Sequence, residues 1–212
     1  DGEHLPSVVY LDNHFRNDGE GEYSGNVIYL STFSKLLAPG LRLAWVVAPP
    51  QVIRKLVMTK QAADLHTSSF NQHVAYEVAK GVFLDEHVKL IRATYKERRD
   101  VMLEMMDEMF PPQVRWAKPQ GGMFLWGVLP ENIDAAEVLK AAIDRKVAFV
   151  PGAAFHPNGG GDNTMRLNFS FSSPDTIREG IIRLGMTLKD ILKKNGHQRK
   201  PLSVMSENNG GS

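Results

Sequence analysis

Residues 27–44 have the sequence VIYLSTFSKLLAPGLRLA, and this stretch decides how the rest of the chain is interpreted. The run Val27–Leu30 is β-branched and aromatic, which is typical of a strand. The apolar run Leu43–Ala48 predicts a second strand. Between the two runs come hydroxyl side chains, Lys35, a Pro-Gly turn signal and Arg42. One lysine, several hydroxyls and one arginine therefore share a loop between two predicted strands.

This loop has the chemistry of an anion site with a lysine beside it. The hydroxyls of Thr32 and Ser34 and the guanidinium fork of Arg42 are suited to holding an anion. Lys35 would then be left to face something other than a carboxylate. Loops between strands also carry lysine and serine simply because they are solvated. The composition of the loop alone therefore leaves an ordinary surface loop open.

The spacing of these residues resembles a known cofactor segment. In fold-type I aminotransferases that use pyridoxal phosphate (PLP), Ser/Thr-x-Ser-Lys precedes x-x-x-Pro-Gly-x-Arg-x-Gly/Ala, as TFSK precedes LLAPGLRLA in residues 32–44. The stretch is most similar to the aminoadipate and kynurenine aminotransferases and to the effector domains of MocR regulators. Thr32 replaces the commoner serine but keeps the hydroxyl. The resemblance implies that Lys35 carries PLP as a Schiff base and that the phosphate is held by Thr32, Ser34 and Arg42.

Two later segments resemble the same family in the same order. The stretch NTMRLNFS, residues 163–170, is similar to the segment that carries the family's carboxylate-binding arginine, which implies that Arg166 binds the substrate carboxylate. An arginine on a short strand is also often a cross-strand ion-pair residue. The stretch GGMFLW, residues 121–126, is similar to a segment near the substrate, so Phe124 would line the pocket. Core packing of Phe124 is an equal alternative.

The bulk properties exclude several classes of protein. The chain has 212 residues, 42% of them hydrophobic, a net charge of +1 and no cysteine. The balanced charge gives no reason to expect binding to nucleic acid or to a membrane, and disulfides and thiolate metal sites are impossible. No third histidine or carboxylate shares the spacing of His66 and His73, so no metal site is expected. We expect a soluble, cytoplasmic protein.

The remaining elements follow from periodicity and punctuation. Ser7–Leu11 is predicted to be a short strand and Asp12–Gly25 a loop. The pair Gly121-Gly122 suggests a close approach of the backbone to another part of the chain. Arg98 and Arg99 are expected on a solvated helix face, and the methionines near residue 105 are expected to pack in the core. Thr67, Ser68 and Ser69 offer an N-cap for a helix that runs through Val82. The other predicted helices are Pro49–His66, Leu84–Phe110, Asp134–Arg145 and Ser173–Asn195. The other predicted strands are Val114–Ala117, Met123–Val128, Val147–Val150 and Met165–Phe171, with a Gly-rich loop at Pro151–Asn163.

The change from long helices to short alternating elements predicts two domains in an α/β chain. Residues 1–110 are expected to be the C-terminal part of a large, mixed-sheet PLP-binding domain, including a linking helix. Residues 111–195 are expected to form a smaller α+β domain, and 196–212 a disordered tail. The family's Asp-x-x-Tyr cofactor segment cannot be placed here. The resemblance therefore implies the C-terminal half of a homodimeric enzyme, inactive and aggregation-prone without its N-terminal half.

Three functions remain open at this stage. The first is an aminotransferase that moves an amino group from aminoadipate, kynurenine or another large α-amino acid to a 2-oxo acid. The second is the PLP-binding effector domain of a MocR transcriptional regulator, which an upstream helix-turn-helix domain would identify. The third is a PLP-dependent acyltransferase of the same fold.

Overall fold

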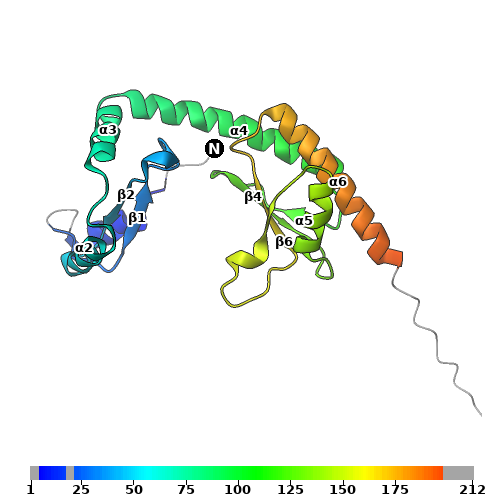
Figure 1. Ribbon diagram of the computed structural model, residues 1–212, viewed down its shortest axis with the longest axis horizontal. Coiled ribbons are helices and arrows are strands. Elements are labelled where there is room, and N and C mark those ends of the chain that lie inside the picture. Colours follow the sequence, from blue (N-terminus) through cyan, green and yellow to red (C-terminus); the bar gives the residue numbers. More distant parts are fainter. Residues whose placement is uncertain (1–4, 18–21, 198–212) are drawn as a thin grey trace, which may run out of the picture. The chain divides into compact units, whose positions relative to one another are not determined.

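The structure is a computed structural model that describes residues 5–17 and 22–197 (Figure 1). The chain divides into two compact units, and the division falls between Arg92 and Ala93, inside a long helix. Each unit is described by itself. Residues 1–4 and most of the predicted tail, from residue 198 onward, lie outside the described residues. Among the described residues, no helix is long and apolar enough to cross a membrane.

The first unit begins with a helix where a strand was predicted. The helix α1 spans Val8–Asn17, so the strand prediction for Ser7–Leu11 is wrong, as is the predicted loop as far as Asn17. Ser7 explains the difference, because its hydroxyl accepts a hydrogen bond from the backbone N–H of Tyr10 at 3.3 Å. A serine in this position starts a helix despite the β-branched residues that follow.

The predicted pair of strands is present as an antiparallel hairpin. Strand β1 spans Tyr29–Thr32 and strand β2 spans Ala44–Val47, with the end residues of each strand opposite those of the other (Figure 1). The 3₁₀ helix η1, Pro39–Leu41, lies in the connection. The first strand starts two residues later than predicted. The backbone N–H of Val27 is instead taken up by the hydroxyl of Tyr23, at 2.8 Å.

The three helices that follow agree with the predicted punctuation. Helix α2 spans Pro50–Asp64, α3 spans Ser69–Ala79 and α4 spans Phe83–Met109. The hydroxyl of Ser68 caps α3 by accepting from the N–H of Asn71 at 3.3 Å. Helix α2 contains no buried residue, and Met58 on it is 62% exposed.

The second unit is a four-stranded antiparallel sheet packed against helices. The strand order is β3-β4-β6-β5. These strands span Arg115–Trp116, Phe124–Val128, Thr164–Asn168 and Val150–Pro151, and the helices are α5, Ala135–Asp144, and α6, Pro174–His197. Strand β5 starts three residues later than predicted. Helix α6 includes Gly196 and His197, which were assigned to the tail.

Side chains alternate across this sheet. Leu125, Met165 and Leu167 are buried in a core shared with α4, α5 and α6. On the other face, Phe124 and Arg166 are not buried. A sheet with one covered face leaves the other face free to carry polar function.

The C-terminal part of α4 belongs to the same core. Met102, Met105 and Met106 are buried, which confirms that the methionines pack in the core. The prediction for Arg99 is wrong, because this side chain is 5% exposed. Its guanidinium donates to the Asp100 carboxylate at 2.7 Å and to the carbonyl oxygen of Pro119 at 3.0 Å. A loop carbonyl and a neighbouring carboxylate thus compensate the burial of its charge.

Candidate functional site

Lys35 lies at an exposed position of a tight turn that directly follows β1. The carbonyl oxygen of Phe33 accepts from the N–H of Leu37 at 2.8 Å and from that of Ala38 at 3.2 Å. These bonds close a single helical turn that is not continued. The lysine is therefore carried by a hydrogen-bonded backbone instead of a loose loop, and its side chain is exposed.

Thr32 ties this turn to the second strand. Its hydroxyl donates to the carbonyl oxygen of Leu43 at 2.9 Å and accepts from the N–H of Ser34 at 3.1 Å. The Oγ atoms of Thr32 and Ser34 lie 3.0 Å apart. Both side chains are half-buried. The one proton of the Thr32 hydroxyl is thus shared between the carbonyl oxygen of Leu43 and Oγ of Ser34, whereas Ser34 accepts and keeps its own rotatable proton for another partner.

Arg42 ends η1 in a left-handed backbone conformation, with φ 54°. This conformation is uncommon for a residue with a side chain and often occurs at functional positions. Its backbone N–H and its Nη1 both donate to the carbonyl oxygen of Pro39, at 3.3 Å and 3.1 Å. In the part of the chain that the structure describes, no carboxylate pairs with this exposed guanidinium. Arg42 therefore brings an unneutralised positive charge to the lysine loop.

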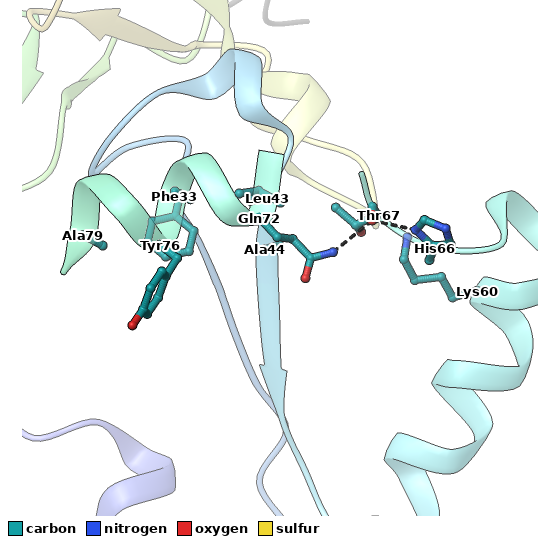
Figure 2. A pocket seen from close by; sticks show the side chains of 10 residues that line it. Phe33, Leu43, Ala44, Lys60, His66, Thr67, Gln72, Tyr76 and Ala79 are labelled. Carbon is teal, nitrogen blue, oxygen red and sulfur yellow. Dashed lines mark hydrogen bonds between the residues drawn. The ribbon is translucent and has the colours of Figure 1, made fainter. Parts of the chain in front are cut away.

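A cavity of about 540 Å³ lies beside the hairpin in the first unit (Figure 2). The hairpin contributes Phe33 to its wall and α3 contributes Tyr76. Figure 2 shows Gln72 and His66 directed at the carbonyl oxygen of Thr67. One nitrogen of each side chain lies 2.9 Å from this oxygen. The full lining consists of Phe33, Leu43, Ala44, Lys60, His66, Thr67, Gln72, Ala75, Tyr76 and Ala79.

Helix α3 is also tied to the lysine loop. The Nδ2 of Asn71 donates to the carbonyl oxygen of Leu41 at 3.1 Å. Leu41 is the last residue of η1 and precedes Arg42. A contact between segments thirty residues apart holds the arginine end of the loop in place. Sequence analysis missed Asn71, because no local pattern relates it to the loop.

Arg166 lies on the uncovered face of the second unit's sheet. It is the register partner of Trp126 on β4 and of Val150 on β5. Its guanidinium carbon lies 4.2 Å from the ring centroid of Phe124 and 4.7 Å from that of Phe155. Within the described residues its guanidinium has no hydrogen bond or ion pair. The cross-strand ion pair that sequence analysis left open is therefore not formed with those residues.

Phe155 is the residue at this site that sequence analysis missed. It belongs to the 3₁₀ helix η2, Gly152–Phe155, inside the predicted Gly-rich loop. Its ring also meets that of Trp126 edge to face, with centroids 5.6 Å apart. An aromatic residue in a loop gives no sequence signal of what it covers. Only the folding of the loop back onto β6 brings Phe155 to Arg166.

The prediction of close backbone approach at Gly121-Gly122 is not supported. No described atom lies within 4 Å of a Cβ built at either position, and Gly122 has φ +80°. The positive φ supplies the reason for glycine there. Close approach occurs instead at Gly152, where a built Cβ would lie 1.8 Å from Oγ1 of Thr164.

Comparison with known proteins identifies the family of this chain. The family model of class I and II aminotransferases matches residues 13–184. The chain is 49% identical to aromatic-amino-acid aminotransferase 1 of Thermococcus litoralis over 80% of this chain and 41% of that protein. A more distant relative is the transcriptional regulator NorG of Staphylococcus aureus, 30% identical over 79% of this chain and 37% of NorG.

Solved structures of aminotransferases also match over less than half of their own length. The α-aminoadipate aminotransferase LysN of Thermus thermophilus superposes with a TM-score of 0.84 at 43% identity, over 92% of this chain and 48% of that one. The kynurenine aminotransferase of Pyrococcus horikoshii gives a TM-score of 0.77 at 50% identity, over 80% and 42%.

The chain thus spans less than half the length of the relatives it matches. The match nevertheless includes the lysine turn and the Arg166 strand in one continuous stretch. These two elements are held by the hydrogen bonds and ring contacts described above, and the fold is that of fold-type I aminotransferases. The chain belongs to the PLP-dependent class I and II aminotransferase family, close to its aminoadipate, kynurenine and aromatic-amino-acid members.

Proposed function

We propose that this chain is the cofactor-lysine and carboxylate-binding portion of an aminotransferase that moves an amino group from a large α-amino acid to a 2-oxo acid. The observation that carries the proposal is the lysine turn. Its hydrogen bonds fix the backbone that carries Lys35, in the loop that also contains Ser34 and Arg42. A loop that only needed to be soluble would not require this bonding or a left-handed arginine.

The donor set fits the phosphate of PLP. Arg42 has only a neutral carbonyl as partner within the described residues, and a phosphate prefers a guanidinium fork. Ser34 can donate its hydroxyl proton. Thr32 serves the same site by holding the turn, because its hydroxyl is already engaged. When bound, PLP supplies an aldehyde that exchanges between amino groups and a ring that accepts electrons.

The protein's own contribution to the chemistry is position and proton transfer. Lys35 holds the cofactor through Nζ and, once released, takes the Cα proton of the substrate as general base. Arg166 holds the substrate α-carboxylate, since its N–H donors are free of partners among the described residues. Phe124 lies against that guanidinium, where it would also line the substrate site.

Aminoadipate, kynurenine and aromatic amino acids are the substrate candidates. The substrates after which the similar proteins are named support this range. The exposed aromatic side chains around Arg166, including Phe155 at 45%, favour a large substrate over a small polar one. Comparing kcat/KM for these three kinds of amino acid tests this range.

We also propose that an N-terminal portion of the same protein covers apolar surface of the first unit. Leu30 on β1 is 69% exposed and Leu65 after α2 is 67% exposed. Burying such side chains on a second segment is favourable by about 1.5–3 kcal/mol each. The complete protein is expected to be a homodimer, as in the family, and the chain alone is expected to be inactive and to associate nonspecifically.

The test of the proposal is Lys35→Ala in the assembled protein with its N-terminal portion. PLP bound to Lys35 absorbs visible light, so the variant should lose this band and the transamination activity. Lys55→Ala, at an exposed position of α2, is the matched control and should keep both. A borohydride-reducible covalent adduct that persists in Lys35→Ala would refute the assignment.

The second candidate is a PLP-binding effector domain of a MocR regulator, and the similarity to NorG favours it. The two functions share the lysine site and differ in turnover. Steady transamination with amino acid and 2-oxo acid supports the enzyme. PLP binding without turnover, together with an upstream helix-turn-helix segment that binds DNA, would support the regulator.

A further inference from the structure

Arg166 is held in place by aromatic rings instead of polar partners. Its guanidinium carbon lies over the rings of Phe124 and Phe155, at 4.2 Å and 4.7 Å. Among the residues that the structure describes, the N–H groups of its guanidinium have no hydrogen-bond partner. An arginine side chain has many rotamers, so an unpartnered fork needs another source of order.

Stacking on a ring supplies this order without consuming a donor. A guanidinium over an aromatic face is attracted by the ring quadrupole and keeps its in-plane N–H groups available. A carboxylate binds bidentately in that plane. A stacked arginine is therefore prepared for a carboxylate, whereas an arginine already paired with an aspartate is not.

Phe155 is itself positioned by tertiary contacts. Its ring packs against Trp126 at an interplanar angle of 75°. The start of η2 lies so close to β6 that only glycine fits at Gly152. Phe155 nevertheless remains 45% exposed, so core packing does not account for a large aromatic side chain here. The guanidinium of Arg166 lies over this exposed ring.

We propose that Phe155 is a positioning residue for the substrate carboxylate, because its ring sets the plane of the Arg166 guanidinium. The proposal rests on the proposed function of Arg166. Amino-acid and 2-oxo acid substrates both carry the α-carboxylate, so loss of the ring should weaken both. The proton transfer at Lys35 should not change once the enzyme is saturated.

The test compares Phe155→Leu and Phe155→Met, which keep bulk without a ring, with Phe155→Tyr in the assembled enzyme. From the strength of a cation–π contact, KM for both substrates should rise roughly three- to thirtyfold in the first two variants. The tyrosine variant should stay near the parent KM, and kcat and the visible cofactor band should stay near parental in all three. Phe171→Leu, in the loop after β6 and 90% exposed, is the control.

A double-mutant cycle with Arg166→Ala separates the possible failures. The proposal predicts that Phe155→Leu has no further effect on KM once Arg166 is removed. If Arg166→Ala raises KM and Phe155→Leu matches the control, the positioning role is overturned and Arg166 keeps its role. If the two effects add fully, Phe155 contacts the substrate directly and the proposal is wrong. If Arg166→Ala leaves both KM values unchanged, the proposed role of Arg166 fails first.

Discussion

Gly152→Ala is the substitution for which the structure gives the sharpest expectation. A Cβ at this position would lie 1.8 Å from Oγ1 and 2.8 Å from Cβ of Thr164, and 2.9 Å from Cζ2 of Trp126. Neither neighbour can move freely. Thr164 is 7% exposed and its hydroxyl donates to the carbonyl oxygen of Gly161 at 2.6 Å. The new methyl group must therefore displace η2 from the sheet or break this hydrogen bond.

The magnitude follows from these two alternatives. Overpacking by one methyl group in a close-packed site costs about 1–3 kcal/mol. Loss of the buried Thr164 hydrogen bond adds about 1 kcal/mol. We expect the free energy of unfolding to fall by about 1–4 kcal/mol, the upper end applying where the hydrogen bond is also lost. Displacement of η2 would also carry Phe155 away from Arg166, so KM for the carboxylate substrates should rise in the molecules that remain folded.

The assay is urea unfolding of the assembled protein, followed by fluorescence, with Gly121→Ala as matched control. A Cβ at Gly121 meets no described atom within 4 Å, so this variant should lie within about 0.5 kcal/mol of the parent. Equal stability of Gly152→Ala and Gly121→Ala would refute the close approach. A destabilised Gly152→Ala with unchanged KM would refute the link between Gly152 and the Arg166 site.

Two further predictions concern the first unit. Hydrogen bonds from Arg16 and Tyr23 lower the pKa of Asp12 to about 2, below the unfolded value of about 3.9. Its stabilising contribution should be present above about pH 4 and be lost as the pH falls toward 2. Asp12→Asn should remove this part of the acid dependence in a pH series of unfolding measurements, and an unchanged series would contradict it. Arg42→Ala should raise the Kd for PLP by about 10–100-fold, from the strength of hydrogen bonds to charged groups, with Arg54→Ala as control. Equal PLP affinity in both arginine variants would remove Arg42 from the cofactor site.

Local signals in the sequence were sufficient for most helices and for the lysine loop. The prolines before α2 and at the start of α6 and the capping Ser68 mark element ends through backbone geometry and hydrogen bonds that lie within a few residues. The hairpin strands, the loop with Lys35 and the core methionines of α4 follow from the same local periodicity. The family also followed from sequence, because the lysine, the Pro-Gly turn and Arg42 lie within one short stretch.

Local patterns failed where a hydrogen bond that no periodicity encodes decides the outcome. Val27 resembles a strand residue, but its N–H bonds to the hydroxyl of Tyr23. Arg99 resembles a solvated helix residue, but it is buried. Its guanidinium donates hydrogen bonds to the carbonyl oxygen of Pro119 and to the carboxylate of the adjacent Asp100. In each case a hydrogen bond outweighs a conformational propensity of only about a few tenths of a kcal/mol per residue.

The sequence by itself determined that a lysine, hydroxyls and an arginine share one loop, and that a second arginine lies on a later strand. Only the tertiary structure decided what surrounds these groups. It engages Thr32 with the backbone, turns Arg42 into a left-handed conformation and places Phe155 over Arg166. The physical reason is that a ring contact or a close approach depends on the folded path of a loop. Neither Gly152 nor Phe155 carries a local pattern that specifies its distant neighbour.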